Sequence, residues 1–228
     1  KKISVFFLSA MMIFMMTSCS KSETYDFGDA KTLSDVREHM EQGKKLTQDF
    51  YFTIKETNKN FETYTEFYRT NGKEVRRLSY DTYQTRFIRT ENEYVVIDDM
   101  KQTAAIYPPE NVHDDIMWSD MDFIISVIDM ALSGEIVNSA ENSESSFTEV
   151  YKIESGDSLI FDFQEGKLNV ITLLDKSDDP IAVYELNYGN KGGKNSLFKY
   201  KGYQITDMKV YGERSSEITQ YTQNTEDS

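Results

Sequence analysis

Alternation of apolar and polar residues with a period of two is the feature that most restricts how this chain folds. Phe50, Phe52 and Ile54 alternate with more polar residues, which is typical of a strand with one buried face. Segments of similar texture follow at 61–69, 73–80, 84–89, 93–98 and 102–107. Asn71 and Gly72 predict a tight hairpin, because a primed turn needs positive φ at both central residues. The first half is therefore predicted to be an antiparallel meander.

The same pattern resumes later in the chain. Further strands are predicted at 147–154, 158–163, 168–174, 181–188 and 203–211. The polar stretch 138–146 is interpreted as a linker, 189–195 as a flexible loop and 212–228 as a frayed polar tail. No fixed-period repeat divides the chain into two domains, so both meanders are expected to belong to one large twisted antiparallel sheet.

Two segments have helical spacing instead. Thr32 can cap a helix over 33–44, and Asn111 or Asp114 can cap a longer helix that ends near Ser133. In the longer helix the stretch 121–132 is apolar around most of its circumference, so it must be buried on more than one side. At about twelve residues, this stretch is too short to span a membrane. The predicted fold class is α+β, with helices packed on one face of the sheet.

The N-terminus has the features of an export signal. Lys1 and Lys2 precede an almost entirely apolar run over 3–16, whose length is typical of a signal-peptide core. The next residues, Met-Thr-Ser-Cys at 16–19, resemble a lipobox, the cleavage motif of bacterial lipoproteins. We expect 1–18 to be a signal peptide and Cys19, the only cysteine, to carry acyl chains such as palmitate. An ordinary secretory signal with an incidental cysteine is the alternative.

The charge of the chain restricts its partners. The formal net charge is −14. Removal of 1–18, which hold two lysines and no acid, takes −14 to −16. Nucleic-acid binding needs clustered Lys and Arg and is therefore excluded. Electrostatic docking to anionic lipid is disfavoured too, so we expect the membrane to be a partner only through the anchor on Cys19, with 19–31 as a flexible tether. The acidity itself is interpreted as a solubility feature rather than as recognition of a cationic partner.

Residues that could carry chemistry are few. His39 and His113 are the only histidines, and a metal or base role would need them to converge with carboxylates. The acidic stretch 175–179 lacks the glycine and terminal glutamate of a calcium loop, so a solvated turn is the simpler interpretation. The sequence has neither a Gly-x-Ser-x-Gly elbow nor a phosphate loop. We therefore expect no enzymatic activity, no metal and no cofactor, and an anchored hydrolase ranks last among the hypotheses.

The order of the elements carries a family resemblance. The lipoprotein leader, the short helix, the Phe/Tyr-rich meander with Gly-Lys-Glu-Val-Arg-Arg at 72–77, the apolar helix and the second meander together resemble the LolA/LolB-like superfamily. That group includes lipoprotein-sorting carriers, the periplasmic regulator RseB and the mycobacterial lipoprotein LppX. The resemblance implies an unclosed half-barrel over 32–211: a large curved antiparallel sheet with helices in its concave face as a lid.

The resemblance also implies a site. Barrel and lid would enclose an apolar cavity for acyl chains, with the helix 116–132 as lid or plug. Arg76 or Arg77 would match the basic strand residue of these families. The implied ligand-facing side chains of the helix are Met117, Met121, Ile124, Ile125 and Ile128. Without the resemblance, an ordinary hydrophobic core is the default interpretation of this Met/Ile stripe.

Two functional hypotheses follow. The leading one is a membrane-anchored lipoprotein that binds a lipid or acylated protein, or senses envelope state. Soluble carriers of the superfamily have no lipobox, so an anchored version is more like an acceptor or a sensor than a shuttle. The alternative is a non-enzymatic structural or protein-interaction lipoprotein whose cavity is filled by its own side chains. Either would lie at the outer face of the plasma membrane or in the periplasm.

Overall fold

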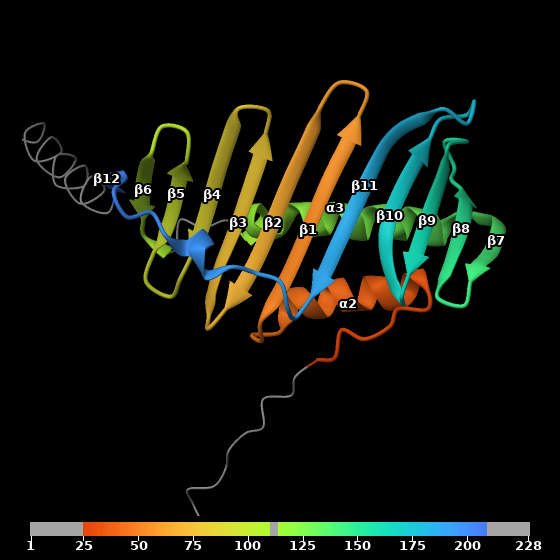
Figure 1. Ribbon diagram of the computed structural model, residues 1–228, viewed down its shortest axis with the longest axis horizontal. Helices are drawn as coiled ribbons and strands as arrows, with labels where there is room; N and C mark the ends of the chain where they lie inside the picture. Colours follow the sequence, from red (N-terminus) through yellow and green to blue (C-terminus); the bar gives the residue numbers. More distant parts are fainter. Residues whose placement is uncertain (1–24, 110–113, 209–228) are drawn as a thin grey trace, which may run out of the picture.

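The computed structural model describes residues 25–109 and 114–208 of the 228-residue chain. Within these ranges the chain forms one twelve-stranded sheet with two α-helices on one face (Figure 1). The helices are α2 (Leu33–Lys45), α3 (Asp114–Ser133) and the 3-10 helix η2 (Asn195–Phe198). The strands are β1 (Phe50–Asn58), β2 (Glu62–Thr70), β3 (Lys73–Tyr80), β4 (Tyr83–Arg89), β5 (Tyr94–Asp98), β6 (Thr103–Tyr107), β7 (Glu135–Ser143), β8 (Ser146–Lys152), β9 (Ser158–Gln164), β10 (Lys167–Leu174), β11 (Pro180–Gly189) and β12 (Gln204–Asp207). The α+β class is confirmed.

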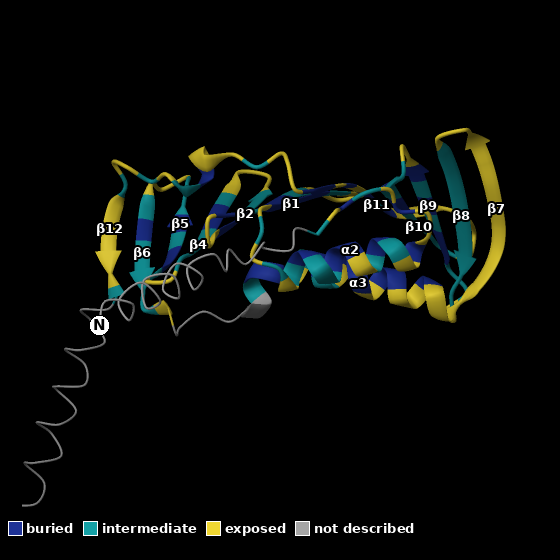
Figure 2. Cartoon of the chain, turned by 90° about the horizontal axis from the view of Figure 1, so that it is seen from below, coloured by how far each residue is buried: buried dark blue, intermediate teal, exposed yellow. Residues whose placement is uncertain are grey.

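The sheet joins the two meanders through its central strand. Its order is β12-β6-β5-β4-β3-β2-β1-β11-β10-β9-β8-β7. Strand β1 pairs with both β2 and β11, so Phe52 lies between Phe67 and Tyr188. The sheet curves around the two helices, and its edge strands β7 and β12 lie at opposite ends of the molecule (Figure 2). This is the expected unclosed half-barrel.

The hairpin between β2 and β3 sets the orientation of the residues that follow it. Asn71 and Gly72 have φ angles of 49° and 70°, as a primed turn requires. Glycine adopts this conformation at little cost, and asparagine tolerates it better than most residues do. The resulting register places Phe67 opposite Arg76, so these two side chains share one face of the sheet.

The start and the buried face of α2 follow from its sequence. The Oγ1 of Thr32 accepts a hydrogen bond from the N–H of Asp35 at 3.2 Å, which confirms the predicted N-cap. Leu33, Val36 and Met40 are all buried, because their spacing places them on one side of the helix. That side packs in the concave face of the sheet beside α3.

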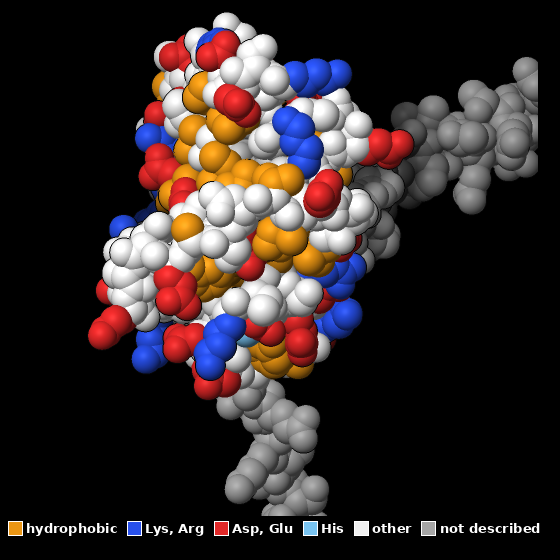
Figure 3. All heavy atoms as spheres, turned by 90° about the vertical axis from the view of Figure 1, so that its right-hand side faces the viewer, with side chains coloured by type: hydrophobic (Ala, Val, Ile, Leu, Met, Phe, Trp, Pro, Cys, Tyr) orange, Lys and Arg blue, Asp and Glu red, His pale blue; other side chains and the backbone are white. Residues whose placement is uncertain are grey.

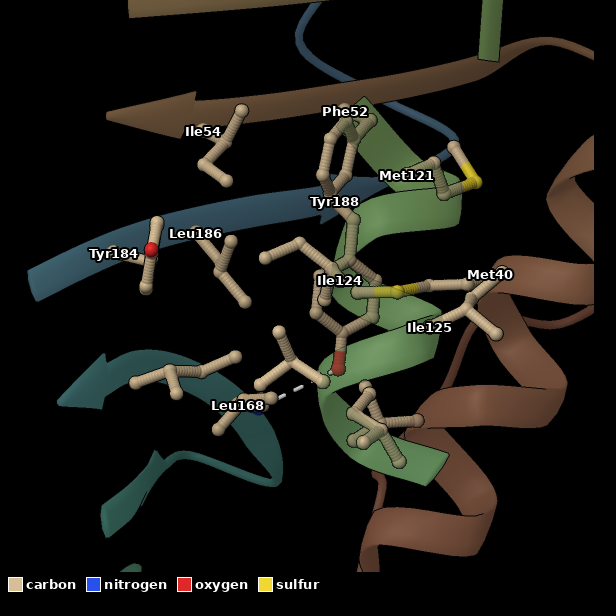
Figure 4. Close-up of a cluster of buried hydrophobic side chains, with 14 of the residues drawn as sticks. Met40, Phe52, Ile54, Met121, Ile124, Ile125, Leu168, Tyr184, Leu186 and Tyr188 are labelled. Atoms are coloured by element: carbon tan, nitrogen blue, oxygen red, sulfur yellow. Dashed lines mark hydrogen bonds between the residues drawn. The ribbon is translucent and has the colours of Figure 1, made fainter. Parts of the chain in front are cut away.

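The concave face holds the main core (Figure 4). Phe52 of β1, Leu186 and Tyr188 of β11, and Ile124 of α3 point toward one another. The hydroxyl of Tyr188, the polar group at the centre of this cluster, accepts a hydrogen bond from the N–H of Leu168 at 3.4 Å. Burial raises the pKa of this hydroxyl to about 12, so it stays a neutral part of the core.

A second, smaller core lies on the convex face. There the segment 190–203, hereafter the strap, crosses the sheet from the end of β11 to β12 (Figure 1). Leu197 of the strap packs on a patch of strand residues, namely Val75, Ile88, Val95, Ile97 and Ala104. The sequence pattern predicted only a flexible loop at 189–195 and gave no indication of this second core.

The stretch 138–146, expected to be a linker, is mostly strand. Strand β7 pairs with β8 and carries irregularities between Ile136 and Asn138 and between Glu141 and Ser143. All nine of its residues are exposed. A strand with no buried face shows no alternation of apolar and polar residues. Because strands are predicted from that alternation, β7 could not be recognised in the sequence.

Two further expectations need correction. The tether predicted over 19–31 does not extend that far: Phe27 and Ala30 are buried, and the N–H of Ala30 donates to the carbonyl of Gly166 at 2.5 Å. The last strand is only Gln204–Asp207 and runs parallel to β6. The expected signal peptide, Cys19 and the polar tail lie outside the described residues. Neither described α-helix is long and apolar enough to span a membrane.

The close approach of α2 to β1 gives a prediction. A Cβ on Gly43 would lie 2.6 Å from Cζ of Phe50, whose ring is fully buried. We expect Gly43→Ala to lower the free energy of unfolding by about 1–2 kcal/mol in urea denaturation, because overpacking outweighs the gain in helix propensity. Gly28→Ala is the control, because a Cβ on Gly28 would lie 3.6 Å from the nearest atom, Oδ2 of Asp26, which is an ordinary van der Waals contact. Equal effects of the two substitutions would contradict this packing.

Candidate functional site: the lid helix and the ends of the concave face

The Met/Ile stripe of α3 is buried in the concave core. Its members are Met117, Met121, Ile124, Ile125 and Ile128, and the most exposed of them retains 6% of its accessible surface. Their neighbours come from β1, β10, β11 and α2 (Figure 4). The clefts of about 720, 330 and 280 Å³ in the described part are lined by none of these five residues. The stripe therefore packs as core.

The helix is nevertheless not covered on all sides. Phe123, Met130 and Leu132 remain more than 40% exposed. The ring of Phe123 lies 5.3 Å from that of Tyr184, centroid to centroid. The prediction that α3 is buried on more than one side is confirmed, because the helix packs against both the sheet and α2. The side of α3 that faces away from both is exposed to solvent.

The two candidate arginines lie on opposite faces of β3. Arg76 is on the concave face and forms a two-pronged ion pair with Asp120 of α3: its Nε donates at 2.6 Å and its Nη2 at 3.1 Å. Arg77 is on the convex face, where its Nη2 lies 2.6 Å from a carboxylate oxygen of Glu66. Of the two, Arg76 is therefore the residue that faces the lid helix, and its charge is already paired with a residue of the chain itself.

Two more acids hold α3 in place. Asp122 pairs with Lys44, and Asp129 pairs with Arg37 at 2.6 Å, both across the interface with α2. These two pairs are largely solvent-exposed and contribute little each. The Arg76–Asp120 pair is better shielded, with side-chain exposures of 10% and 23%. All three acids thus fix one position of the helix, and none of them is left to bind a ligand.

A layer of buried charge lies next to the Arg76–Asp120 pair. Arg69 donates to the carbonyl of Gly43 at 2.7 Å and ion-pairs with Glu74, and its guanidinium lies 5.5 Å from the Trp118 ring. Arg89 pairs with the same Glu74. These contacts tie β2, β3, β4, α2 and α3 together.

The histidine and the acidic turn considered above have structural roles. His39 is packed among the rings of Tyr25, Phe27 and Tyr188, and burial lowers the pKa of its imidazole. Asp175 accepts hydrogen bonds from the backbone of its own turn, which lower its pKa. Within 25–109 and 114–208, no group of three or more His, Cys, Asp or Glu side chains could hold a metal ion. His113 lies outside the described residues.

A cleft that the sequence did not indicate lies at the β7 end of the concave face. This acidic cleft has a volume of about 720 Å³. It is lined by Asp29, Ala30, Lys31, Ser139, Glu141, Ser143, Glu144, Ser145, Ser146, Phe147, Glu149, Glu165 and Gly166. Five of these residues are acids and one is a lysine. The cleft depends on β7 being a strand and on the N-terminal segment packing beside the β9–β10 turn, which are the two features that the sequence pattern did not indicate.

Comparison with known proteins finds only distant structural similarity. No protein-family model matches the chain, and no curated protein matches its sequence. Among solved structures, LprF from Mycobacterium bovis is 10% identical, with 73% of this chain and 97% of LprF covered and a TM-score of 0.40. An uncharacterized conserved protein from Thermus thermophilus is 11% identical, with coverages of 75% and 99% and a TM-score of 0.38.

The Pseudomonas aeruginosa MucA/MucB complex gives a further match. The matched chain of that complex is 13% identical to this protein. The similarity covers 72% of this protein and 60% of the matched chain, with a TM-score of 0.40. Similarity at this level assigns no residue, ligand or partner to this chain.

The shielded ion pair on α3 can be tested against an exposed pair on the same helix. Asp120→Asn removes the charge that faces Arg76, and we expect it to lower the free energy of unfolding by about 1–3 kcal/mol. Asp129→Asn makes the same change at the exposed Arg37 pair, and its effect should stay within about 0.5 kcal/mol. Urea denaturation of both variants measures the difference. A larger loss for Asp129→Asn would contradict the role assigned to Arg76.

Proposed function

We propose that this protein is a lipid-anchored, non-enzymatic component of the bacterial cell envelope that binds a protein partner at its surface. The half-barrel serves as a rigid scaffold in this proposal, and its interior is filled by its own side chains. The observation that carries the proposal is the complete burial of the lid-helix stripe, because an interior that is already filled has no room for an acyl chain.

The energy of lid opening supports a filled scaffold over a lipid carrier. Met117, Met121, Ile124 and Ile128 are each at most 1% exposed. Removing such a side chain from a core costs about 1.5–3 kcal/mol, so exposing all four costs about 6–12 kcal/mol. That equals the whole stability of a typical domain, about 5–15 kcal/mol. A lipid would have to replace nearly all of these contacts before it could enter.

The anchor gives the scaffold a defined place. If Cys19 carries the acyl chains, six residues (19–24) precede the first described residue, Tyr25. A fully extended segment of this length reaches about 20 Å. The proposal therefore keeps the domain close to the membrane, within reach of partners that are themselves at the surface, and the acidic surface discourages closer contact with anionic lipid.

The proposal assigns no catalytic residue. His39 is enclosed by aromatic rings, and its imidazole has no hydrogen-bond partner for Nδ1 within the described part of the chain. A general base needs hydrogen-bond reach to a substrate, and this position does not offer it.

Shortening single side chains of α3 tests whether the interior is filled. We expect Ile124→Ala and Ile128→Ala each to lower the free energy of unfolding by about 2–5 kcal/mol, because both side chains are fully packed. Binding of an apolar dye to the chain from residue 20 onward should not decrease. Thermal melts and dye titration are the measurements, and Met130→Ala, at an exposed position of the same helix, is the control. Mild destabilisation with a large loss of dye binding would favour a lipid-binding lid instead.

A further inference from the structure

We propose that the free edge of β7 accepts an extended, basic peptide segment as a thirteenth strand, whose side chains enter the acidic cleft. This inference rests on the proposed function and deepens it, because it gives the chemistry of the partner and the place where it binds. Three independent features of the β7 end carry the inference: an open backbone edge, exposed apolar side chains and uncompensated negative charge.

The first feature is the open edge. Strand β7 is the last in the sheet order and pairs with β8 alone among the described strands. It is nine residues long and exposed throughout. An edge strand presents a row of unpaired N–H and C=O groups that can pair with another strand. The opposite edge, β12, has only four residues, so β7 is the longer template.

Strand β7 also lacks two of the features that protect edges. Its sequence, Glu135 to Ser143, contains neither proline nor a basic residue. Its two irregularities leave a regular stretch, in which Asn138, Ser139, Ala140 and Glu141 pair in sequence with β8. Bulges and charged side chains are the usual means by which proteins prevent strand addition. The central four residues therefore remain competent to pair on their free side.

The second feature is apolar surface where α3 passes into β7. Ile136 and Val137 are 50% and 53% exposed, and Leu132 of α3 is 43% exposed. Viewed from this end, the molecule shows hydrophobic side chains gathered between charged ones (Figure 3). Exposed apolar side chains beside an open edge provide anchoring contacts for the side chains of an added strand.

The third feature is charge. The acids of the cleft, Asp29, Glu141, Glu144, Glu149 and Glu165, face a single lysine, Lys31. Within the described ranges no ion pair is formed by any of these five acids, whereas Asp120, Asp122 and Asp129 of α3 each have a cationic partner. Uncompensated negative charge around a cleft attracts a positively charged partner and disfavours a negative one.

Charge therefore decides the occupant. A second copy of this chain would bring the same five acids against one another in a protein of net charge −14. An extended peptide rich in Lys or Arg would neutralise them instead. Alternate residues of an added strand point to the same face of the sheet. Ser139 and Glu141 lie on the cleft side of β7, so every second residue of the partner should be basic there, with apolar residues beside Ile136 and Val137.

A synthetic peptide of about ten residues that alternates Lys and Val tests this proposal. The full chain is kept in neutral detergent micelles. Binding of the peptide is measured by fluorescence anisotropy. Protection of the backbone amides of the protein is measured by hydrogen exchange. We expect saturable binding, new protection confined to amides of 135–143, and affinity that falls about tenfold or more in high salt. The Glu141→Gln and Glu144→Gln double variant should weaken binding. The charge-matched control, Glu91→Gln with Asp178→Asn, changes exposed residues away from the cleft and should not.

Two control peptides separate strand pairing from simple charge attraction. An alternating Glu/Val peptide should not bind. A Lys/Val peptide N-methylated at every second residue keeps its charge but loses pairing along one edge, and it should bind at least about tenfold more weakly. Equal binding of the methylated peptide, or binding without protection of 135–143, would overturn strand addition. Self-association through β7, seen by sedimentation, would overturn the choice of occupant. Each of these results would leave the proposed filled scaffold intact. A lipid bound in the interior is the result that would contradict the scaffold.

Discussion

The burial of α3 between the curved sheet and α2 is the contact on which the rest of this structure depends. A twelve-stranded sheet that curves without closing has a concave face that must be covered. Met121, Ile124 and Ile128 fill that face from the helix side, against aromatic and aliphatic side chains of β1 and β11. These positions are fully buried, and the clefts found in the described part of the chain are not lined by them.

The charged residues divide the molecule into two regions. On α3, Asp120, Asp122 and Asp129 are all paired within the chain, and they hold the helix against β3 and α2. At the β7 end, the acids of the cleft lack such partners among the described residues and lie beside a strand whose backbone is open on one side. Binding energy is available where groups are unpaired in the free protein. This distribution supports the proposal that a partner is recognised at the end of the sheet, outside the concave core.

The sequence predicted the elements whose local pattern and tertiary role agree. Phe52 and Ile54 alternate because one face of β1 is buried, and the Thr32 cap and the Asn71–Gly72 turn are determined by local chemistry. A two-residue hairpin at 71 and 72 also places Phe67 opposite Arg76, so the turn itself determines that Arg76 shares the face of a core aromatic residue.

The features that the sequence missed depend on long-range contacts. Strand β7 has no buried face, so only its pairing with β8 makes it a strand. The strap becomes part of a core only because the convex face of β3–β6 offers an apolar patch that Leu197 covers. Phe27 lies in a mostly polar segment without periodic apolar spacing, and nothing local indicates that it packs beside His39 and Phe50. The acidic cleft combines two of these missed features and was therefore out of reach.

Native mass spectrometry of the protein purified from its own envelope tests the filled interior most directly. The account predicts a mass equal to the polypeptide with its covalent acyl groups, with no further molecule retained after detergent is removed in the gas phase. Retention of one lipid per chain, bound without a covalent bond and lost on unfolding, would contradict it. That result would show that α3 encloses a ligand in place of the packed core.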